Sequence, residues 1–173
     1  HVFSENPLRP AYMGGEQKPP DPLLPEIDWI EYPEGVYAIG HNGEGFSFDN
    51  ETPVHKEYAN RFNLASRLVT NREYLEFIED GGYKRPEIWL SDGWNTVEAN
   101  NWTAPLYWEE KNGSWQYFTL SGIRDIALDE PVCHVSYYEA DAFARWAGAR
   151  LSTEAEWEIA ASNLSIEGNF VEN

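Results

Sequence analysis

The side chains of this chain that could do covalent chemistry gather in residues 131–161, PVCHVSYYEADAFARWAGARLSTEAEWEIAA. Cys133 directly precedes His134, and a thiol beside an imidazole is the pairing of a nucleophile with its general base. Adjacent residues of an extended strand, however, point to opposite faces. If PVCHVS is a strand, the thiol and the imidazole do not meet. This interpretation makes Cys133 a buried, inert thiol and leaves His134 to bind a backbone carbonyl or a carboxylate.

Three carboxylates at alternate positions, Glu154, Glu156 and Glu158, are the second chemical candidate in this segment, because carboxylates can ligate metal ions. Thr153 and Glu156, however, have the spacing of a capping box, in which two side chains satisfy backbone N–H groups at the start of a helix. Glu154 falls in the first turn of the same helix, where the macrodipole favours negative charge. We therefore interpret Glu154 and Glu156 as structural.

The same capping-box pattern occurs three times and predicts three helices. They begin after Thr70, Ser136 and Thr153, each followed by a glutamate three residues later. Glycines predict where two of them end, at residues 81–82 and at Gly148. The apolar faces expected from helical spacing are Tyr74, Phe77 and Ile78 on the first helix, Ala140, Phe143, Ala144 and Ala147 on the second, and Trp157, Ala160 and Ala161 on the third.

Other residues that could form a site also receive structural interpretations. Trp146 and Trp157 are predicted to be core residues, and Arg150 is expected to pair with a nearby carboxylate. Residues 49–51, Asp-Asn-Glu, lack the regular spacing of a calcium loop and instead predict a turn.

The remaining histidines, His1, His41 and His55, do not stand at the i, i+4 spacing of a paired metal site. The sequence contains no nucleotide-binding loop and no zinc pattern. No residue is therefore assigned a catalytic, cofactor-binding or metal-ligating role.

Composition limits the classes of partner. The chain has 173 residues and a formal net charge of −18, which disfavours binding to nucleic-acid phosphates and to anionic membranes. Eight Trp, ten Tyr and eight Phe supply bulky core material. The single cysteine excludes a disulfide framework within the chain and favours a reduced, cytoplasmic setting.

The chain divides into a connector and a mixed α+β domain. Seven of its eleven prolines fall in residues 6–33, a stretch that we expect to be extended rather than a regular helix or a central strand. A compact domain is expected to begin near Ile27, with short strands and hairpins over residues 36–69. Asn112-Gly113 predicts a tight hairpin turn between APLYWE and SWQYFTL.

Residues 131–161 closely resemble the signature of the formylglycine-generating, sulfatase-modifying-factor domain, and LVTNREYLEFIEDGGY is similar to the first helix of that family. Ser152 stands where the family usually has proline. The resemblance implies an α+β, C-type-lectin-like fold of the sulfatase-modifying-factor type, incomplete at the C-terminus. Residues 1–26 are then a proline-rich connector from a missing N-terminal helical bundle, and residues 27–173 are the N-terminal part of the domain.

Within this family the segments NPLRPAY, PEIWLSDGW, APLYWE and EGNFVEN look most like the ergothioneine-biosynthesis branch. That resemblance implies an iron(II)-dependent sulfoxide synthase that joins a thiol donor to hercynine with O2. Selenoneine synthases are similar. The iron ligands are expected to lie outside this chain, on the helical bundle, and most substrate contacts on the missing C-terminal remainder. Residues 131–161 are then mainly scaffold, and this chain alone is expected to bind no cofactor and to be inactive and marginally stable.

Two alternatives stay open. One is a formylglycine-generating oxidase, which modifies a cysteine of sulfatases and whose paired active-site cysteines would lie downstream of this chain. The other is a non-enzymatic, lectin-like binding module, because lectin-like folds also serve as display scaffolds.

Overall fold

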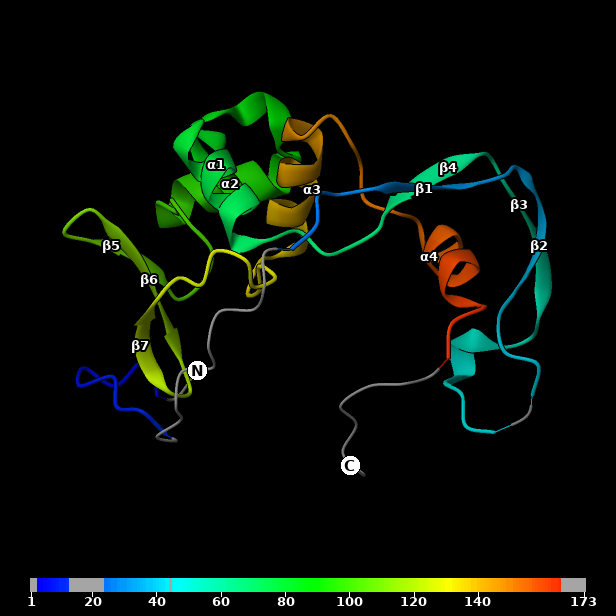
Figure 1. Cartoon of the computed structure of the whole chain (residues 1–173), viewed down its shortest axis with the longest axis horizontal. Helices are drawn as coiled ribbons and strands as arrows, with labels where there is room; N and C mark the ends of the chain where they lie inside the picture. The colour runs from blue at the N-terminus through cyan, green and yellow to red at the C-terminus, as the bar shows by residue number, and fades with distance from the viewer. Residues whose placement is uncertain (1–2, 13–23, 44, 166–173) are drawn as a thin grey trace. The chain divides into compact units, whose positions relative to one another are not determined.

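The computed structural model describes residues 3–12, 24–43 and 45–165 and shows a mixed α+β chain (Figure 1). No helix among these residues is both long enough and apolar enough to cross a membrane. The helices are α1 (Asn71–Glu79), α2 (Ser91–Asn100), α3 (Tyr137–Trp146) and α4 (Glu154–Ala161), with 3-10 turns η1 (Asp49–Glu51), η2 (Gly82–Lys84) and η3 (Pro86–Ile88). The strands are β1 (Trp29–Tyr32), β2 (Gly35–Ile39), β3 (His55–Ala59), β4 (Phe62–Ala65), β5 (Trp108–Lys111), β6 (Ser114–Thr119) and β7 (Gly122–Asp125).

The chain forms two compact units, each built from two separate stretches of sequence. Unit 1 comprises His1–Glu26 and Leu68–Leu151, and unit 2 comprises Ile27–Arg67 and Ser152–Asn173. Residues 131–161 are therefore shared between the units: α3 belongs to unit 1 and α4 to unit 2. That residues 27–173 act as one domain stays a prediction.

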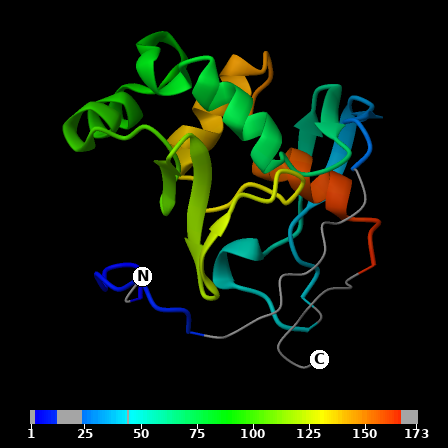
Figure 2. The ribbon, with the colours of Figure 1, turned by 60° about the vertical axis from the view of Figure 1, so that its left-hand side comes forward.

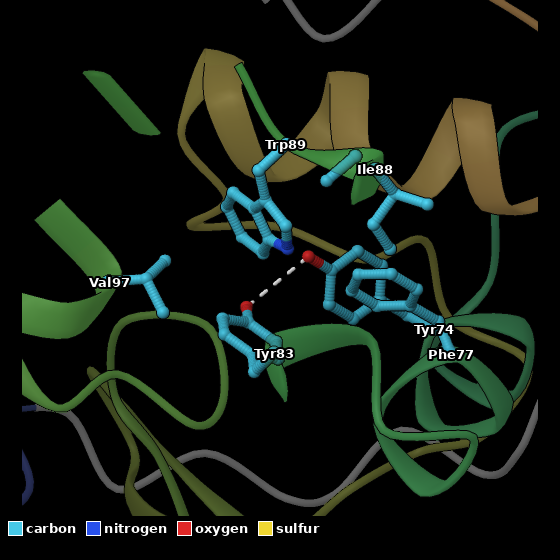
Figure 3. Close-up of a cluster of buried hydrophobic side chains, with 7 residues drawn as sticks. Tyr74, Phe77, Tyr83, Ile88, Trp89 and Val97 are labelled. Carbon is cyan, nitrogen blue, oxygen red and sulfur yellow. Dashed lines mark hydrogen bonds between the residues drawn. The ribbon is translucent and has the colours of Figure 1, made fainter. Parts of the chain in front are cut away.

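Unit 1 is built around a buried aromatic core between α1, α2 and α3 (Figures 1 and 3). Tyr74 and Phe77 on α1 are 1% and 0% exposed, and Ala142 on α3 is fully buried opposite them. The Phe143 ring stacks on Tyr74 with 5.4 Å between ring centroids. The buried members of this cluster are Tyr74, Phe77, Tyr83, Ile88, Trp89, Val97 and Ala142.

All three predicted capping boxes are present, so the predicted helix starts are confirmed. Thr70, Ser136 and Thr153 each accept a hydrogen bond from the backbone N–H three residues later, and the glutamate there binds the cap residue's own N–H. The two predicted ends are confirmed as well, because Gly81 and Gly148 follow their helices in the left-handed conformation, with φ of 77° and 71°. Helix α2 carries no capping box, and sequence reasoning missed it.

The backbone before α3 is not a strand, so the condition under which PVCHVS would separate the Cys133 and His134 side chains is not met. Pro131 makes a single bridge to Thr70, and His134 takes a left-handed φ of 63°. The alternation of faces that was expected to separate Cys133 from His134 therefore does not apply. Instead, residues 127–132 run along the start of α1, where the carbonyls of Glu130 and Leu128 accept from the N–H groups of Asn71 and Arg72. These bonds satisfy N–H groups that an α-helix leaves open at its start.

The predicted hairpin is confirmed as β5 and β6. Lys111 pairs with Ser114 across the two-residue turn Asn112-Gly113, whose φ angles of 55° and 78° are both positive, as a primed turn requires. The third strand of this antiparallel sheet, β7, follows β6, and sequence reasoning missed it.

Unit 2 consists of two antiparallel ribbons and α4 (Figure 2). β1 pairs with β4 and β2 with β3, so the hairpin region is confirmed, and β1 lies inside the proline-rich stretch without being a central strand. The small core of this unit joins α4 to the ribbons through Ala155 and Ile159. Its buried members are Ile39, Ala59, Phe62, Ala155 and Ile159.

Two of the predicted apolar faces are wrong in part. On α4 the buried apolar residues are Ala155 and Ile159, whereas Trp157 is 63% exposed and is not a core residue. On α3, Ala147 is exposed, and the buried face includes Ala142 and Glu139 in its place. In both helices, packing against neighbouring elements buries a set of side chains that differs in part from the set that the sequence indicated. Trp146, by contrast, packs against the core of unit 1 as predicted.

We predict that Gly82→Ala destabilises unit 1. A Cβ at position 82 would lie 2.2 Å from Cε2 of Phe77, which is fully buried, and we expect a loss of about 1–3 kcal/mol in urea unfolding. In the double variant Gly82→Ala/Phe77→Leu, the loss of unfolding free energy should be smaller than the sum of the losses in the two single variants. Gly81→Ala is the matched control: its Cβ would meet nothing within 4 Å, so its cost should add to that of Phe77→Leu. Unchanged stability of Gly82→Ala would contradict this packing.

Candidate functional site

The chemical candidates of residues 131–161 are divided between the two units. Cys133 and His134 lie in unit 1, and Glu154, Glu156 and Glu158 lie in unit 2. Among the described residues, no group of three or more His, Cys, Asp and Glu side chains is placed to hold a metal ion.

Cys133 is an exposed thiol, not the buried one that the sequence indicated. Partial desolvation raises the pKa of its thiol above the ordinary value, the Glu130 carboxylate raises it further, and Arg124 opposes both effects. Its neighbour His134 packs its ring against Tyr107, with 4.9 Å between centroids in an edge-on arrangement. A thiol whose pKa is raised is mostly protonated near neutral pH, and a protonated thiol is a poor nucleophile. The raised pKa of the Cys133 thiol and the packing of His134 against Tyr107 do not support a Cys–His catalytic pair.

The most deeply buried carboxylate of this segment is Glu139, which is 3% exposed. Its Oε1 accepts a 2.5 Å hydrogen bond from the Tyr83 hydroxyl, and its Oε2 accepts a 2.7 Å bond from the backbone N–H of Ser136. The Tyr83 hydroxyl also lies 3.3 Å from that of Tyr74, the contact drawn dashed in Figure 3. Both oxygens of Glu139 therefore hold the start of α3 against the core.

Burial raises the pKa values of both tyrosines strongly, and the Glu139 carboxylate raises them further. Tyr74 and Tyr83 therefore remain protonated at physiological pH, and Tyr83 can always donate to Glu139. Sequence reasoning identified the capping role of Glu139 and missed its bond to Tyr83, which lies 56 residues away in the chain. The sequence feature that could have drawn attention to Tyr83 was its position directly after Gly82, at the end of the first predicted helix.

The carboxylates of α4 have separate structural partners. Glu156 is 8% exposed and accepts from the N–H of Thr153 at 2.9 Å, which confirms its capping role. Glu158 Oε1 accepts from the N–H of Gly40 at 2.6 Å and so joins α4 to the end of β2. Glu154 is exposed in the first turn, as predicted.

A second polar cluster joins β6, β7 and the loop before α3. The Glu130 carboxylate accepts from the Tyr117 hydroxyl and from Arg124 Nη2, both at 2.8 Å, and Arg124 also donates to the Tyr117 hydroxyl. Burial, followed by the hydrogen bond to Glu130, raises the pKa of Tyr117 to about 12. This cluster fixes the loop that carries Cys133 and leaves its tyrosine protonated.

The remaining candidates each have a local structural setting. His41 donates its backbone N–H to Glu51, and its ring Nε2 is buried with no hydrogen-bond partner among the described residues. His55 lies on β3 with Nε2 3.7 Å from Glu57. The predicted turn at Asp49–Glu51 is confirmed as a 3-10 turn. Arg150 donates to the carbonyl of Leu151, and His1 lies outside the described residues.

Comparison with known proteins identifies a family and two kinds of relative. The profile of the family described as "Sulfatase-modifying factor enzyme 1-like domain" matches residues 17–170. The hercynine oxygenase of Mycobacterium tuberculosis is 44% identical over 127 residues, covering 73% of this chain and 29% of that protein. The hercynine oxygenase of Mycolicibacterium smegmatis is 40% identical over 138 residues, covering 79% of this chain and 32% of that protein.

The second kind of relative is a formylglycine-generating enzyme from Streptomyces coelicolor. It is 35% identical over 146 residues, covering 76% of this chain and 46% of that protein. The chain thus spans about a third of the length of the hercynine oxygenases that it matches and just under half of this enzyme.

We predict that Glu139→Ala destabilises unit 1 by about 3 kcal/mol in urea unfolding, because it leaves the Tyr83 hydroxyl and the Ser136 N–H buried without their acceptor. Glu76→Ala is the matched control, since Glu76 is exposed on α1, and its cost should stay below about 0.5 kcal/mol. Equal losses of unfolding free energy in Glu139→Ala and Glu76→Ala would show that the buried hydrogen bonds of Glu139 do not stabilise unit 1.

We predict that the Cys133 thiol titrates above the roughly 8.5 of an ordinary cysteine. The rate of alkylation by iodoacetamide should rise with pH and reach its midpoint above that of a short cysteine peptide measured alongside. Cys133→Ser should abolish labelling, because Cys133 is the only cysteine. A midpoint below that of the peptide would indicate an activated thiolate and reopen the nucleophile interpretation.

Proposed function

The chain belongs to the sulfatase-modifying factor enzyme 1-like domain family, and on this premise we propose that it is part of an iron(II)-dependent sulfoxide synthase of the ergothioneine-biosynthesis type. The observation that carries the proposal is the 40–44% identity to two hercynine oxygenases over about three quarters of the chain. The proposed reaction joins the sulfur of a thiol donor, such as γ-glutamylcysteine or cysteine, to an imidazole carbon of hercynine. One molecule each of thiol, hercynine and O2 would give the sulfoxide and one molecule of water.

We further propose that the α+β fold is of the C-type-lectin-like kind. Short antiparallel ribbons and helices with capped starts support this proposal. In the whole protein, the partners of this chain would be an N-terminal helical bundle and the C-terminal remainder of the same domain, in a cytoplasmic setting.

The described residues do not fit the iron of this proposal. An iron(II) site of this type needs several histidine nitrogens or carboxylates directed at one point, and no such group exists among the described residues. Two acidic side chains of residues 131–161 already have hydrogen-bond donors: Glu139 binds the Tyr83 hydroxyl, and Glu158 binds the backbone N–H of Gly40. We therefore propose that the ligands lie elsewhere in the whole protein, and we derive no reaction step through the metal.

The proposed role of residues 131–161 is structural. Glu139 holds α3 against the aromatic core of unit 1. Glu156 caps α4, and Glu158 joins that helix to Gly40. These bonds fix the backbone of both helices, and a rigid backbone is what a catalytic site in the rest of the protein would require.

A second candidate function is that of a formylglycine-generating oxidase acting on a sulfatase cysteine. It is favoured by the match to the formylglycine-generating enzyme of Streptomyces coelicolor, which extends over 46% of that protein. The lower identity of 35%, against 40–44% for the hercynine oxygenases, makes it the second choice.

The test is a paired assay of the full-length protein under air, reconstituted with iron(II) for the sulfoxide reaction and with copper for the sulfatase-peptide reaction. With hercynine and γ-glutamylcysteine or cysteine, we expect the C–S-bonded sulfoxide by mass spectrometry, and with a cysteine-containing sulfatase peptide we expect no formylglycine. Because Cys133 is proposed to be structural, Cys133→Ser should retain turnover within about twofold, whereas loss of a catalytic nucleophile typically costs several orders of magnitude. Formylglycine without sulfoxide would replace the proposal with the second candidate, and neither product would contradict both.

A further inference from the structure

Residues 3–12 fold into a compact piece, the 3–12 loop, that is held together by its own contacts. The rings of Phe3 and Tyr12, at its two ends, have centroids 5.1 Å apart. Between them, the carbonyl of Asn6 accepts from the N–H of Arg9 at 2.8 Å and closes a turn with a proline at its second position. Asparagine at the first position and proline at the second are favoured in such turns, so the turn is encoded locally. Short surface loops whose ends meet are often functional.

The 3–12 loop lies against the β5–β7 sheet in unit 1 and is joined to it by polar contacts (Figure 1). Arg9 Nη1 binds Glu109 Oε2 on β5 at 2.7 Å, and the N–H of Tyr12 donates to the carbonyl of Leu120 at 2.7 Å. Apolar burial contributes little, because every residue from 5 to 12 is exposed. A segment with few buried apolar contacts opens at a lower free energy than the core beside it.

The 3–12 loop forms one wall of a depression whose other wall is largely apolar. The depression has a volume of about 230 Å3, and Ser4, Glu5 and Arg9 line it from the loop. The remaining lining residues come from the start of the sheet and from β6: Leu106, Tyr107, Trp108, Glu109 and Phe118. Lifting the loop would remove the polar wall and open the apolar one to solvent.

Arg9 is a strained residue of the 3–12 loop. Its φ of 40° is left-handed, which is uncommon for a residue other than glycine, asparagine or aspartate. Strained residues persist where other contacts hold them, and the ion pair with Glu109 is such a contact. Because Arg9 is the last residue of the turn, a change of its φ leaves the hydrogen bond of the turn intact. The position of the loop on the sheet therefore balances strain at Arg9 against its ion pair, and the turn itself depends on neither.

We propose that the 3–12 loop is a lid over this depression and that the Arg9–Glu109 ion pair is its latch. In the closed state, which is the one described above, the latch and the hydrogen bond from Tyr12 to Leu120 are both formed. In the open state both are broken, and the loop moves as one piece because its internal turn persists. The proposal concerns unit 1 alone and does not depend on the proposed sulfoxide synthase activity.

The experiment is amide-resolved hydrogen exchange of the full-length protein. The Tyr12 amide reports opening, because its acceptor is on the sheet, and the Arg9 amide reports the integrity of the loop, because its acceptor is Asn6. Glu109→Gln removes the latch and nearly preserves the size of the side chain. We expect it to accelerate exchange at Tyr12 about two- to fivefold, the factor that a surface ion pair predicts, and to leave exchange at Arg9 unchanged.

A second variant, a control and salt test the latch itself. Arg9→Gln should accelerate exchange at Tyr12 at least as much as Glu109→Gln, because Arg9 is the only basic residue of the 3–12 loop. Glu87→Gln removes a carboxylate that binds Arg85 at 2.9 Å elsewhere in unit 1, and it should leave Tyr12 unchanged. In about 1 M NaCl, which screens exposed ion pairs, wild-type Tyr12 should exchange as fast as in Glu109→Gln.

Three results would overturn the proposal. Exchange at Tyr12 that is equal in the wild type and in both latch variants would show that the ion pair does not hold the lid. Acceleration at Arg9 together with Tyr12 in Glu109→Gln would show that the loop unravels instead of moving as one piece. A wild-type Tyr12 amide with no protection at all would show that the lid is not closed.

Discussion

The hydrogen bond from the Tyr83 hydroxyl to Glu139 is the interaction on which unit 1 depends most. It places a carboxylate with 3% exposure inside an aromatic core, where an unpaired charge would be very unfavourable. The second carboxylate oxygen binds the N–H of Ser136, so one side chain satisfies a core tyrosine and the start of α3 together. Because the Tyr83 hydroxyl remains protonated, this arrangement does not change across physiological pH.

The loop before α3 is fixed by contacts on both of its sides. The carbonyls of Leu128 and Glu130 accept from the first N–H groups of α1, and the Glu130 side chain binds Tyr117 and Arg124 of the sheet. Cys133 and His134 are thereby held in a connection between α1, α3 and the β5–β7 sheet. An exposed thiol with a raised pKa is consistent with this structural role.

Features that depend on a few neighbouring residues were predictable from the sequence. Capping boxes and the Asn112-Gly113 turn are set by local hydrogen bonds and by local φ preferences, and the structure contains them where they were expected. The helical face of α4 was not predictable, because Trp157 is more apolar than Ala155, yet it is Ala155 that meets the ribbons.

The errors around the candidate site also arise from contacts between residues that are far apart in the sequence. PVCHVS has the composition of a strand, but it forms an isolated bridge from Pro131 to Thr70 instead of a strand, and the loop turns at His134. The bond between Tyr83 and Glu139 joins residues 56 positions apart, and no local pattern in a single sequence indicates such a pair. The family, by contrast, was recognisable from a short segment, because its signature is dense in rare residue types.

A double-mutant cycle of Tyr83→Phe and Glu139→Met in urea unfolding is the most direct test of this account. Each substitution removes one partner of the hydrogen bond and nearly preserves volume, so the coupling free energy isolates the pair. We predict a coupling of about 1.5–3 kcal/mol, the value for a hydrogen bond to a charged group. A coupling below about 0.5 kcal/mol would contradict the account, because Glu139 would then not hold α3 against the core through Tyr83.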